Sequence, residues 1–529
     1  SYASVGPKTL HLRLTRAGGD AVQANLAFEV RRLDTPAPDD TLAITAGITY
    51  QGVAGTGDAY VYLADGHTAI ERPLLLFEGF DLTNTMNWDE LYELLNRENL
   101  IETLRTRGFD AVVLNFTDAT DYIQRNAFVA VELLQQVRAL VGPEQELVVS
   151  GASMGGLVGR YALAYMEDTG IDHGVTTFIS FDSPQLGAAI PLGLQYWLWF
   201  FADDSPEAAE LLAALDSPAA RQLLIYHYTD PPGTSGQPDP LRAALLSDLA
   251  AVGDYPALPR LVALANGSAT QLDQGFSAGA QIIDWEYTSF LVDITGNVWA
   301  VPNGTGQTIF HGLIDIILLP EDEVFVNVAG TDPFDSAPGG WRDSMAELDA
   351  TEAPYGDIVA LHPSHCFIPS VSSLALEGTD LFHDIAGDPD LLSRTPFDVV
   401  YYPLVNEEHV DINAQNVVWL LEEIDPASSA LNDFEPARGT SRIQLTSGNP
   451  LRGSLAFRIS QPRDSHVRVD LIDVSGRVRA EFLDESLPAG VHEFQWDDRS
   501  LGGRALNEGV YFLRLRTEDA LVARKVVLP

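Results

Sequence analysis

The sequence predicts an α/β protein, with a mainly parallel sheet covered by helices on both faces, followed by an all-β sandwich at the C-terminus. Three observations predict this fold. Between residues 70 and 184, continuous runs of Val, Ile, Leu and Phe alternate with segments of helical apolar spacing, which is typical of buried parallel strands. Two later segments interrupt this alternation, one with a helical pattern and one with an antiparallel strand pattern. Residues 442–529 alternate at period two between turn signals, without a helical pattern.

The first part of the chain contains the regular alternation. Residues 1–68 show short strand patterns that we expect to lead into the sheet. The segments after residue 68 predict strands at 72–81, 110–118, 145–153 and 175–184, with helices at 87–108, 125–142 and 156–168 between them. Because neighbouring parallel strands need a crossover connection, a helix between consecutive strands is the expected link.

The two interruptions come after this region. Residues from about 186 to 256 have the pattern of helices and loops, and residues from about 285 to 365 alternate like antiparallel strands. A buried strand is predicted between them at 259–268. A last sheet strand at 397–405 and a helix at 414–424 complete a domain over 69–424, and the Pro-, Ser- and Ala-rich segment 425–441 is predicted to be a linker.

An aromatic run opens the first insertion. It comprises Tyr196, Trp197, Trp199, Phe200 and Phe201. Two interpretations are equally open. Either the run forms a lid or pocket over a site, which would favour hydrophobic substrates, or it is an apolar helix that packs on the mainly parallel sheet.

The composition is strongly acidic. The net charge is −44, and lysine occurs only at Lys8 and Lys525. Such a charge repels nucleic acid and anionic membranes, so binding to either is not expected. An acidic, lysine-poor surface is instead typical of a protein that stays soluble in concentrated salt, where the repulsion between its own charges is screened.

The single cysteine, Cys366, excludes an intramolecular disulfide and thiolate-rich zinc or iron–sulfur sites, and we expect no cofactor or metal. No uninterrupted apolar run approaches the roughly 20 residues of a membrane-spanning helix, so we expect no transmembrane segment. The chain opens on SYASVGPK, without an initiator methionine or a signal-peptide pattern. We therefore expect a mature or trimmed product.

The segment Gly151-Ala152-Ser153-Met154-Gly155 fits the pattern G-x-S-x-G. A strand predicted before it and a helix predicted after it supply the context in which this pattern forms a sharp turn that exposes a nucleophilic serine. Small residues two positions before and after the serine prevent clashes in such a turn, and the helix N-terminus favours developing negative charge. We predict that Ser153 is a nucleophile; the alternative is a merely structural glycine-rich turn.

With this turn and the elements around it, residues from roughly 70 to 425 resemble the α/β-hydrolase superfamily, in particular its lipases and esterases. The segment FDSPQLGA is similar to the Thr-Pro-His-x-Gly segment of many lipases, although Gln185 replaces the histidine. The resemblance implies a serine hydrolase of carboxylic esters that works through a Ser-His-Asp triad and an acyl-enzyme, without a cofactor. The alternatives are an amidase, peptidase or acyltransferase, or a non-catalytic surface protein with a vestigial hydrolase fold.

The resemblance also implies an oxyanion hole made of two backbone N–H groups. One belongs to Met154, the residue after the nucleophile. The other belongs to Phe80, in the segment Glu78-Gly79-Phe80, which stands where lipases commonly have His-Gly-x. The side chain of Glu78 is expected to point away from the oxyanion.

The general base is expected to be a histidine in the loop after the last sheet strand. His409 follows the strand predicted at 397–405 and precedes a helix, as the α/β-hydrolase resemblance requires. His362 and His365 are less favoured alternatives. A thiol nucleophile or metal site at His365 and Cys366 has no further ligand cluster to support it.

Two aspartates are the main candidates for the acid of the triad. Most α/β-hydrolases place this residue after the strand that is here 259–268, which would select Asp273. Pancreatic-type lipases place it one strand earlier, which would select Asp182 at the end of the strand 175–184. We favour Asp182, although a cap of the following Ser-Pro turn would also explain it. Acidic residues within 320–335 stay open as well.

Residues from about 440 to 529 resemble immunoglobulin-like domains of the flagellar hook-capping type and the C-terminal sorting domains of the type IX secretion pathway. The similarity is carried by Asn449-Pro450 and by the segments DLIDVSGRV, LPAGVHEFQWD, GVYFLRL and ARKVVLP. These are turn and core residues of a sandwich, without chemistry of their own. This resemblance implies a secreted or surface-attached protein and allows for contact with a secretion machinery through the C-terminal domain. The resemblance to hydrolases implies small-molecule, lipid or polyester esters as substrates.

Overall fold

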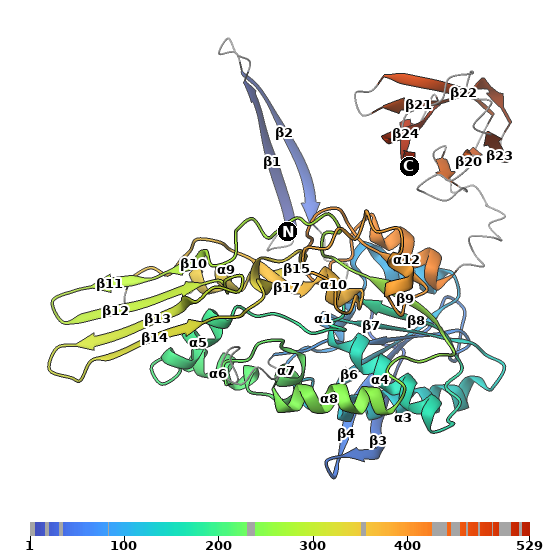
Figure 1. The fold of residues 1–529 in the computed structure, drawn as a ribbon. Coiled ribbons are helices and arrows are strands. Elements are labelled where there is room, and N and C mark those ends of the chain that lie inside the picture. The colour runs from blue at the N-terminus through green and yellow to red at the C-terminus, as the bar shows by residue number, and fades with distance from the viewer. Residues whose placement is uncertain are drawn as a thin grey trace. The chain divides into compact units, whose positions relative to one another are not determined.

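A computed structural model describes the greater part of the chain (Figure 1). The described residues are 6–15, 21–30, 35–82, 84–229, 239–350, 356–425, 442–445, 455–461, 464–473, 477–488, 490–496, 509–517 and 521–528. The chain divides into two compact units, Ser1–Ile424 and Asp425–Pro529. Apart from Asp425, the predicted linker 425–441 lies outside the described residues.

The first unit is built on a sheet of eight strands in the order β18-β9-β8-β7-β5-β6-β4-β3. Its strands are β3 (Asp40–Tyr50), β4 (Val53–Tyr62), β5 (Pro73–Phe77), β6 (Asp110–Phe116), β7 (Leu147–Ala152), β8 (Val175–Phe181), β9 (Arg260–Leu264) and β18 (Val399–Tyr401). All neighbours from β6 to β18 are parallel, while β4 is antiparallel to both β6 and β3. The predicted mainly parallel sheet is confirmed, and its strand order agrees with the resemblance to α/β-hydrolases.

The N-terminal strands divide between two sheets. Strands β3 and β4 join the eight-stranded sheet, as predicted for residues 1–68. Strands β1 (Gly6–Thr15) and β2 (Ala21–Val30) instead pair only with each other, from Gly6↔Val30 to Thr15↔Ala21. The expectation that all of these strands lead into the sheet is therefore wrong for the first two, because each finds a partner of equal length in the other.

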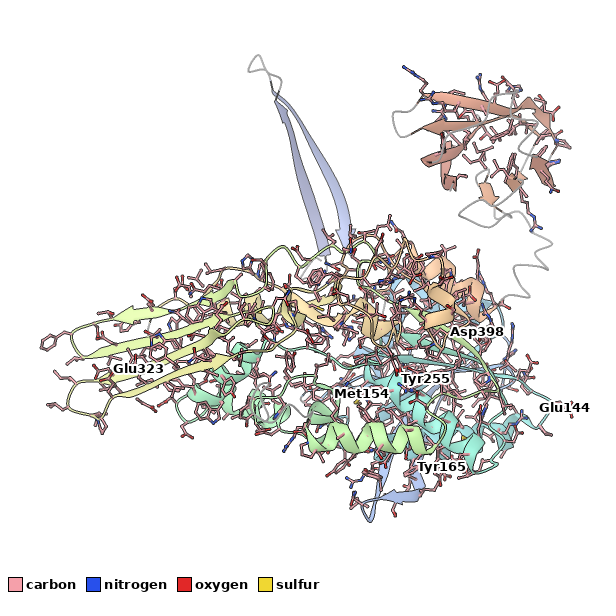
Figure 2. The ribbon with its side chains drawn as sticks, in the orientation of Figure 1. Glu144, Met154, Tyr165, Tyr255, Glu323 and Asp398 are labelled. Carbon is pink, nitrogen blue, oxygen red and sulfur yellow. The ribbon has the colours of Figure 1, made fainter. Side chains whose placement is uncertain are left out.

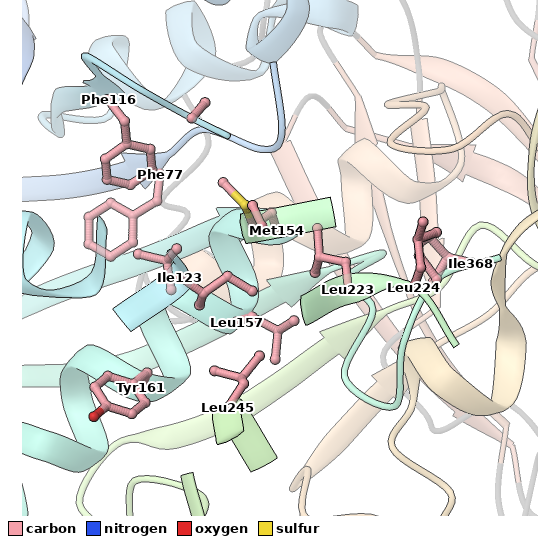
Figure 3. Close-up of a cluster of buried hydrophobic side chains, with 14 of the residues drawn as sticks. Phe77, Phe116, Ile123, Met154, Leu157, Tyr161, Leu223, Leu224, Leu245 and Ile368 are labelled. Atoms are coloured by element: carbon pink, nitrogen blue, oxygen red, sulfur yellow. The ribbon is translucent and has the colours of Figure 1, made fainter. Parts of the chain in front are cut away.

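Helices cover both faces of the sheet. Alternate side chains of β5 point to opposite faces, so Leu75 and Phe77 join one apolar cluster while Leu74 and Leu76 join another. The first cluster includes residues of α3 (Ile123–Val141) and α4 (Met154–Asp168), and Figure 3 shows part of it. The second includes residues of α1 (Trp88–Leu95), α2 (Leu100–Thr106) and α12 (Asn416–Ile424).

The prediction of one helix over 87–108 is wrong. A capping box between Asn87 and Glu90 starts α1, but a 3-10 turn η1 (Arg97–Asn99) separates it from α2. The break occurs because Glu98 and Asn99 have left-handed backbone angles, with φ of 54° and 57°.

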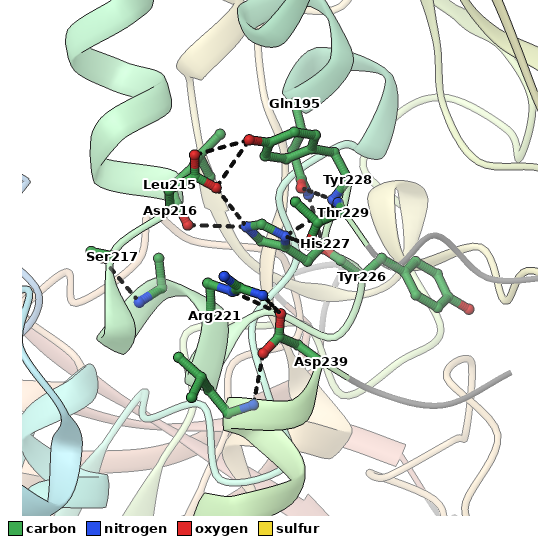
Figure 4. A network of polar contacts seen from close by, with 12 residues as sticks. Gln195, Leu215, Asp216, Ser217, Arg221, Tyr226, His227, Tyr228, Thr229 and Asp239 are labelled. Carbon is green, nitrogen blue, oxygen red and sulfur yellow. Dashed lines mark hydrogen bonds and ion pairs between the residues drawn. The ribbon is translucent and has the colours of Figure 1, made fainter. Parts of the chain in front are cut away.

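The first insertion is helical, as predicted. It contains α5 (Leu192–Phe201), α6 (Pro206–Leu215), α7 (Pro218–Leu223) and α8 (Pro240–Ala251). A polar network connects residues of these helices with the segment 226–229 (Figure 4). The buried imidazole of His227 lies 2.7 Å from Thr229 Oγ1 and 3.1 Å from the carbonyl oxygen of Leu215, and Arg221 pairs with Asp239 at 2.8 Å.

The second insertion is β-rich, as predicted. It forms a sheet in the order β14-β13-β12-β10-β16, with β11 paired to β12, and a separate antiparallel pair of β15 and β17. The strands are β10 (Gln281–Asp284), β11 (Glu286–Thr288), β12 (Val292–Trp299), β13 (Gln307–Ile316), β14 (Asp322–Val328), β15 (Gly339–Arg342), β16 (Val359–Ala360) and β17 (His365–Pro369). Short helical segments η2 (Phe334–Ser336), α9 (Ser344–Asp349), α10 (Ser370–Ser373) and α11 (Leu391–Arg394) lie within or after it.

The aromatic run forms α5, which packs on the sheet of the second insertion. The ring of Trp285 lies 5.8 Å from Trp197 and 5.1 Å from Phe201, and Phe200 meets Phe310 at 5.7 Å. The run is thus a packed helix, as in the second interpretation, but its partner is the sheet of the second insertion and not the eight-stranded sheet. In the described chain no helix is both long and apolar enough to cross a membrane.

The second unit consists of two antiparallel sheets, β19-β20-β23 and β22-β21-β24-β25. The strands are β19 (Arg442–Leu445), β20 (Leu455–Gln461), β21 (Ser465–Asp473), β22 (Val478–Leu487), β23 (Gly490–Trp496), β24 (Gly509–Arg516) and β25 (Leu521–Leu528). Both sheets contribute to one apolar cluster, for example Phe457 from the first sheet and Val469 and Leu513 from the second. The predicted all-β character of this region is confirmed.

Candidate active site

Ser153 lies in a strained turn between β7 and α4. Its backbone angles are φ 52° and ψ −126°, a conformation that costs free energy in a residue with a side chain. A Cβ on Gly151 would lie well within 3.0 Å of the carbonyl oxygen of Gly155, and one on Gly155 would meet the carbonyl of Phe77 in the same way. The turn is therefore tight enough to require the two glycines that the sequence pattern supplies.

The structure brings three of the predicted residues into one chain of hydrogen bonds. The Nε2 atom of His409 lies 2.8 Å from Ser153 Oγ, and its Nδ1 atom lies 2.7 Å from Asp182 Oδ2. The side chains of His409 and Asp182 are completely buried. Because a carboxylate can only accept, Nδ1 carries the proton that is donated to Asp182, which leaves Nε2 to accept the proton of the Ser153 hydroxyl.

Each of the three residues follows a strand of the eight-stranded sheet. Ser153 follows β7, Asp182 follows β8, and His409 lies in the loop between β18 and α12. These strands are parallel, so their carboxyl ends lie at the same edge of the sheet. This explains how residues up to 256 positions apart meet there.

Both carboxylate oxygens of Asp182 accept hydrogen bonds. Its Oδ1 accepts the backbone N–H of Asn266, two residues after the end of β9, at 3.1 Å, while its Oδ2 accepts from His409. A Cβ on Gly340 would lie well within 3.0 Å of Oδ2. The carboxylate therefore fills the space beside a glycine of the second insertion.

The alternative acid, Asp273, lies elsewhere. Its side chain is exposed, and its Oδ1 accepts the N–H of Gly275 at 2.9 Å. It closes a turn after β9. Because Nδ1 of His409 already donates to Asp182, Asp273 is not the partner of this histidine.

Residues of the second insertion contact the loop that carries His409. The backbone N–H of Trp341 donates to the carbonyl of Glu407 at 3.0 Å, and the N–H of His409 donates to the carbonyl of Trp341 at 2.9 Å. The ring of Phe367, from β17, meets the imidazole edge-to-face at 4.9 Å. Sequence reasoning did not include Gly340, Trp341 or Phe367 in the site, because no local pattern marks them as its neighbours.

The electrostatic environment of His409 favours its neutral form. Burial lowers its pKa from the ordinary value of 6.5, and the hydrogen bond and charge of Asp182 oppose this effect. The positive charge of Arg342 lowers the pKa further, and Glu408 raises it. A neutral imidazole is the form that can take a proton from Ser153.

The two residues expected to supply an oxyanion hole, Met154 and Phe80, are in segments next to Ser153. Met154 follows Ser153 directly as the first residue of α4. Gly79, which precedes Phe80, lies against the serine: a Cβ on Gly79 would lie 3.0 Å from the Cβ of Ser153 and 3.6 Å from its Oγ. Phe80 lines the same pocket as Ser153. The buried carboxyl of Glu78 accepts the backbone N–H of Phe116, and burial raises its pKa well above the ordinary value.

An apolar pocket opens beside Ser153. It is lined by Phe80, Leu82, Pro184, Ala188, Ile190, Ala214, Leu215, Ala220, Leu223, Leu224, Phe367 and Ile368. Seven of these twelve residues, from Ala188 to Leu224, belong to the first insertion. The pocket therefore suits a hydrocarbon group next to the serine hydroxyl.

The other histidines considered for the base lie outside this arrangement. The Nδ1 atom of the buried His365 lies 2.8 Å from the carbonyl oxygen of Cys366, and its Nε2 lies 3.1 Å from Ser344 Oγ. The ring of His362 contacts Phe276. Within the described ranges, no group of three or more His, Cys, Asp or Glu side chains is arranged to hold a metal ion.

Comparison of the sequence with family models finds no match, and comparison with curated proteins finds none either. Among solved structures, similarity is found to the thermophilic carboxylesterase EstE1 from a metagenomic library, with 15% identity, a TM-score of 0.27, and coverage of 44% of this chain and 70% of that one. An esterase from Pyrobaculum calidifontis shows 16% identity, a TM-score of 0.26, and coverage of 44% and 66%.

Est1E from Butyrivibrio proteoclasticus shows 16% identity and a TM-score of 0.19, with coverage of 27% of this chain and 50% of that one. The chain thus spans about half the length of Est1E. With TM-scores below 0.5, these likenesses are too weak to assign an activity to this chain, so its chemistry is inferred from the geometry of Ser153, His409 and Asp182.

Proposed function

We propose that the protein is a serine hydrolase that cleaves carboxylic esters, with Ser153, His409 and Asp182 as its catalytic triad. The observation that carries this proposal is the continuous hydrogen-bonded chain from the strained Ser153 through a buried His409 to a buried Asp182. A serine in a structural turn would need neither partner. An activated serine needs both, because the base removes its proton and the acid holds the base in the correct tautomer.

In the proposed reaction, Ser153 Oγ attacks the ester carbonyl carbon as Nε2 of His409 takes the hydroxyl proton. Asp182 stabilises the imidazolium that forms. The N–H groups of Met154 and Phe80 bind the oxyanion, aided by the N-terminus of α4. The imidazolium then donates its proton to the departing alkoxide, which leaves an acyl group on Ser153.

Water completes the cycle. The water oxygen attacks the acyl carbonyl carbon while Nε2 of His409 takes a proton from the water. His409 then donates this proton to Ser153 Oγ as the acid product leaves. All proton transfers in this sequence are served by one imidazole, so the residues of this chain suffice for the chemistry.

The pocket supports esters with a hydrocarbon part. Its lining is apolar and contains several alanines, which leave room beside the serine. Lipid, polyester and small-molecule esters all offer such a group. A series of nitrophenyl esters of increasing acyl length would show the chain length beyond which the pocket no longer accommodates the acyl group and the rate falls.

The proposal is tested by labelling the full chain with a fluorophosphonate, which reacts with activated serines. We expect labelling that is lost in Ser153→Ala and kept in Ser277→Ala, where the replaced serine is exposed. A well-folded protein that is not labelled would overturn the hydrolase proposal. Cleavage of nitroanilides in preference to nitrophenyl esters would instead identify an amidase.

We further propose that the second unit is an immunoglobulin-like sandwich that serves export or surface attachment. The similarity of its sequence segments to sorting domains supports this, as do its two antiparallel sheets with one apolar cluster. Comparing the location of the full chain with that of a chain ending at residue 424 in the source cell tests it. Equal secretion of both would contradict the proposed role.

A further inference from the structure

Two turns at one end of the sheet in the second insertion expose large apolar side chains. Phe290 and Leu291, between β11 and β12, are 88% and 54% exposed. Ile317, Leu318 and Leu319, between β13 and β14, are 48%, 96% and 60% exposed. We call residues 290–291 and 317–319 the apolar tip.

The two turns form one surface. Strands β12 and β13 pair from Val292↔Ile316 onward, and the N–H of Ile317 donates to the carbonyl of Leu291 at 3.0 Å just beyond that pair. The hairpins extend away from the eight-stranded sheet (Figure 1), and Glu323 lies on this extension (Figure 2). The tip is therefore the convex end of a projection.

The stability of the sheet does not account for the tip. Its core contacts lie further back, where Trp285 and Phe310 pack against α5. Exposing five large apolar side chains to water is energetically unfavourable. An exposed apolar patch with a rim of polar residues usually marks an interaction site.

The charges around the tip restrict what it can bind. Residues 281–330 contain no lysine or arginine and seven acidic residues: Asp284, Glu286, Asp293, Asp315, Glu321, Asp322 and Glu323. This excludes nucleic acid and anionic lipid surfaces. A second copy of the chain is also disfavoured, since each copy would bring an acidic rim and a net charge of −44.

We propose that the apolar tip inserts into an uncharged lipid–water interface, such as a zwitterionic bilayer or a droplet of neutral ester. A convex group of Phe, Leu and Ile side chains needs a soft surface that closes around it, and aromatic and aliphatic side chains at loop ends bury their apolar area in such an interface. An uncharged surface does not repel the acidic rim. The binding does not depend on the proposed hydrolase activity.

Helix α5 connects the projecting sheet with the pocket of the candidate site. Helix α5 holds the projecting sheet through Trp197 and Phe201, and the segment just before α5 contributes Ile190 to the pocket beside Ser153. Docking through the tip therefore anchors the part of the molecule that contains this pocket.

The test is sedimentation of the full chain with phosphatidylcholine vesicles. We expect binding that falls at least tenfold in Phe290→Ser/Leu318→Ser and is unchanged in Leu140→Ser/Leu258→Ser, which removes two other exposed leucines, 63% and 74% exposed. At low salt, phosphatidylglycerol vesicles should capture less protein than phosphatidylcholine vesicles, and added salt should reduce the difference.

Three results would overturn the proposal: no binding of the native chain to phosphatidylcholine vesicles, equal binding by the tip variant, or stronger binding to the anionic vesicles at low salt. A native dimer that the tip variant converts to monomer, without vesicle binding, would assign the tip to self-association instead. Because the substituted side chains are exposed, matched circular dichroism melts should show that all variants are folded. Ser153→Ala should bind vesicles like the native chain, which separates this test from that of the hydrolase.

Discussion

Gly340 lies so close to Asp182 that a single carbon atom added to it would collide with the carboxylate. That carboxylate oxygen, Oδ2, is the one that accepts the Nδ1–H of His409. Gly340 belongs to β15 of the second insertion, and its neighbour Trp341 exchanges backbone hydrogen bonds with the loop of His409. The insertion thus forms a wall of the candidate site.

Replacing Gly340 by alanine should lower kcat without unfolding the protein. The added methyl displaces Asp182 or β15, and a misplacement of about 1 Å can cost of the order of 100-fold in rate. We expect a loss of at least tenfold in ester hydrolysis. Gly306→Ala is the matched control, because a Cβ there meets only Ala329 at 3.9 Å. Equal activity of the two variants would contradict the proposed role of the contact.

Asp182→Asn should abolish most of the turnover, and Asp273→Asn should not. An asparagine at 182 can donate to Nδ1, which favours the wrong tautomer of His409, and a loss of about 10⁴-fold is known for such a change in a catalytic triad. Asp273 is exposed and only closes a turn. Steady-state kinetics of both variants decide the matter, and a large loss in Asp273→Asn alone would reverse the assignment.

The acid limb of kcat/KM should lie below pH 6.5. Activity requires neutral His409, and burial lowers the pKa of this imidazole from 6.5, so the neutral form persists as the pH falls. Arg342→Gln removes a positive charge that lowers this pKa, and it should shift the limb upward by a fraction of a unit. Arg394→Gln, at another exposed arginine, is the control. A limb above 6.5 in the native protein would contradict the assignment of the base.

Asp335→Asn should change how stability depends on pH. Burial raises the pKa of Asp335 to about 7, although its Oδ2 accepts the N–H of Val301 at 2.8 Å. Because the folded-state pKa exceeds the unfolded value of about 3.9, this carboxyl stabilises the fold below pH 3.9, and the effect is lost as the pH rises through 7.

Asparagine keeps an acceptor for Val301 but does not ionise. The stability of the variant relative to the native protein should therefore rise between pH 4 and pH 7, by an amount of the order of 4 kcal/mol. Urea unfolding at several pH values measures it. Asp398→Asn is the control, since Asp398 also accepts a backbone N–H, that of Leu261, but is exposed. If the free energies of unfolding of the native protein and Asp335→Asn changed with pH by the same amount, the prediction would be refuted.

We propose that the acidic surface is an adaptation to concentrated salt, and we expect the melting temperature to rise with added NaCl. With 75 acidic and 31 basic residues, the folded chain repels itself, and the Debye length falls to about 3 Å at 1 M salt. Sucrose of the same osmolarity controls for solute exclusion, which stabilises without screening. A gain no larger in NaCl than in sucrose would speak against charge screening.

The sequence by itself determined the parallel strands of the sheet, most of the helices that cover it and the position of the strained serine. These features depend on local causes: apolar periodicity decides which faces are buried, and glycines at 151 and 155 are required by a turn a few residues long. The kinked helix after Asn87 escaped prediction, since its break rests on two left-handed residues within an otherwise helical pattern.

Only the tertiary structure decided which aspartate meets His409, which lies 227 residues further along the chain than Asp182. Both Asp182 and Asp273 follow buried strands, so their local patterns are equivalent, and the order and ends of the packed strands make the difference. The same holds for Gly340, Trp341 and Phe367, whose contact with the site depends on how the second insertion folds back, and for the aromatic run, whose partner is a sheet formed some 90 residues later. Contacts between segments so far apart are set by packing, which no local pattern encodes.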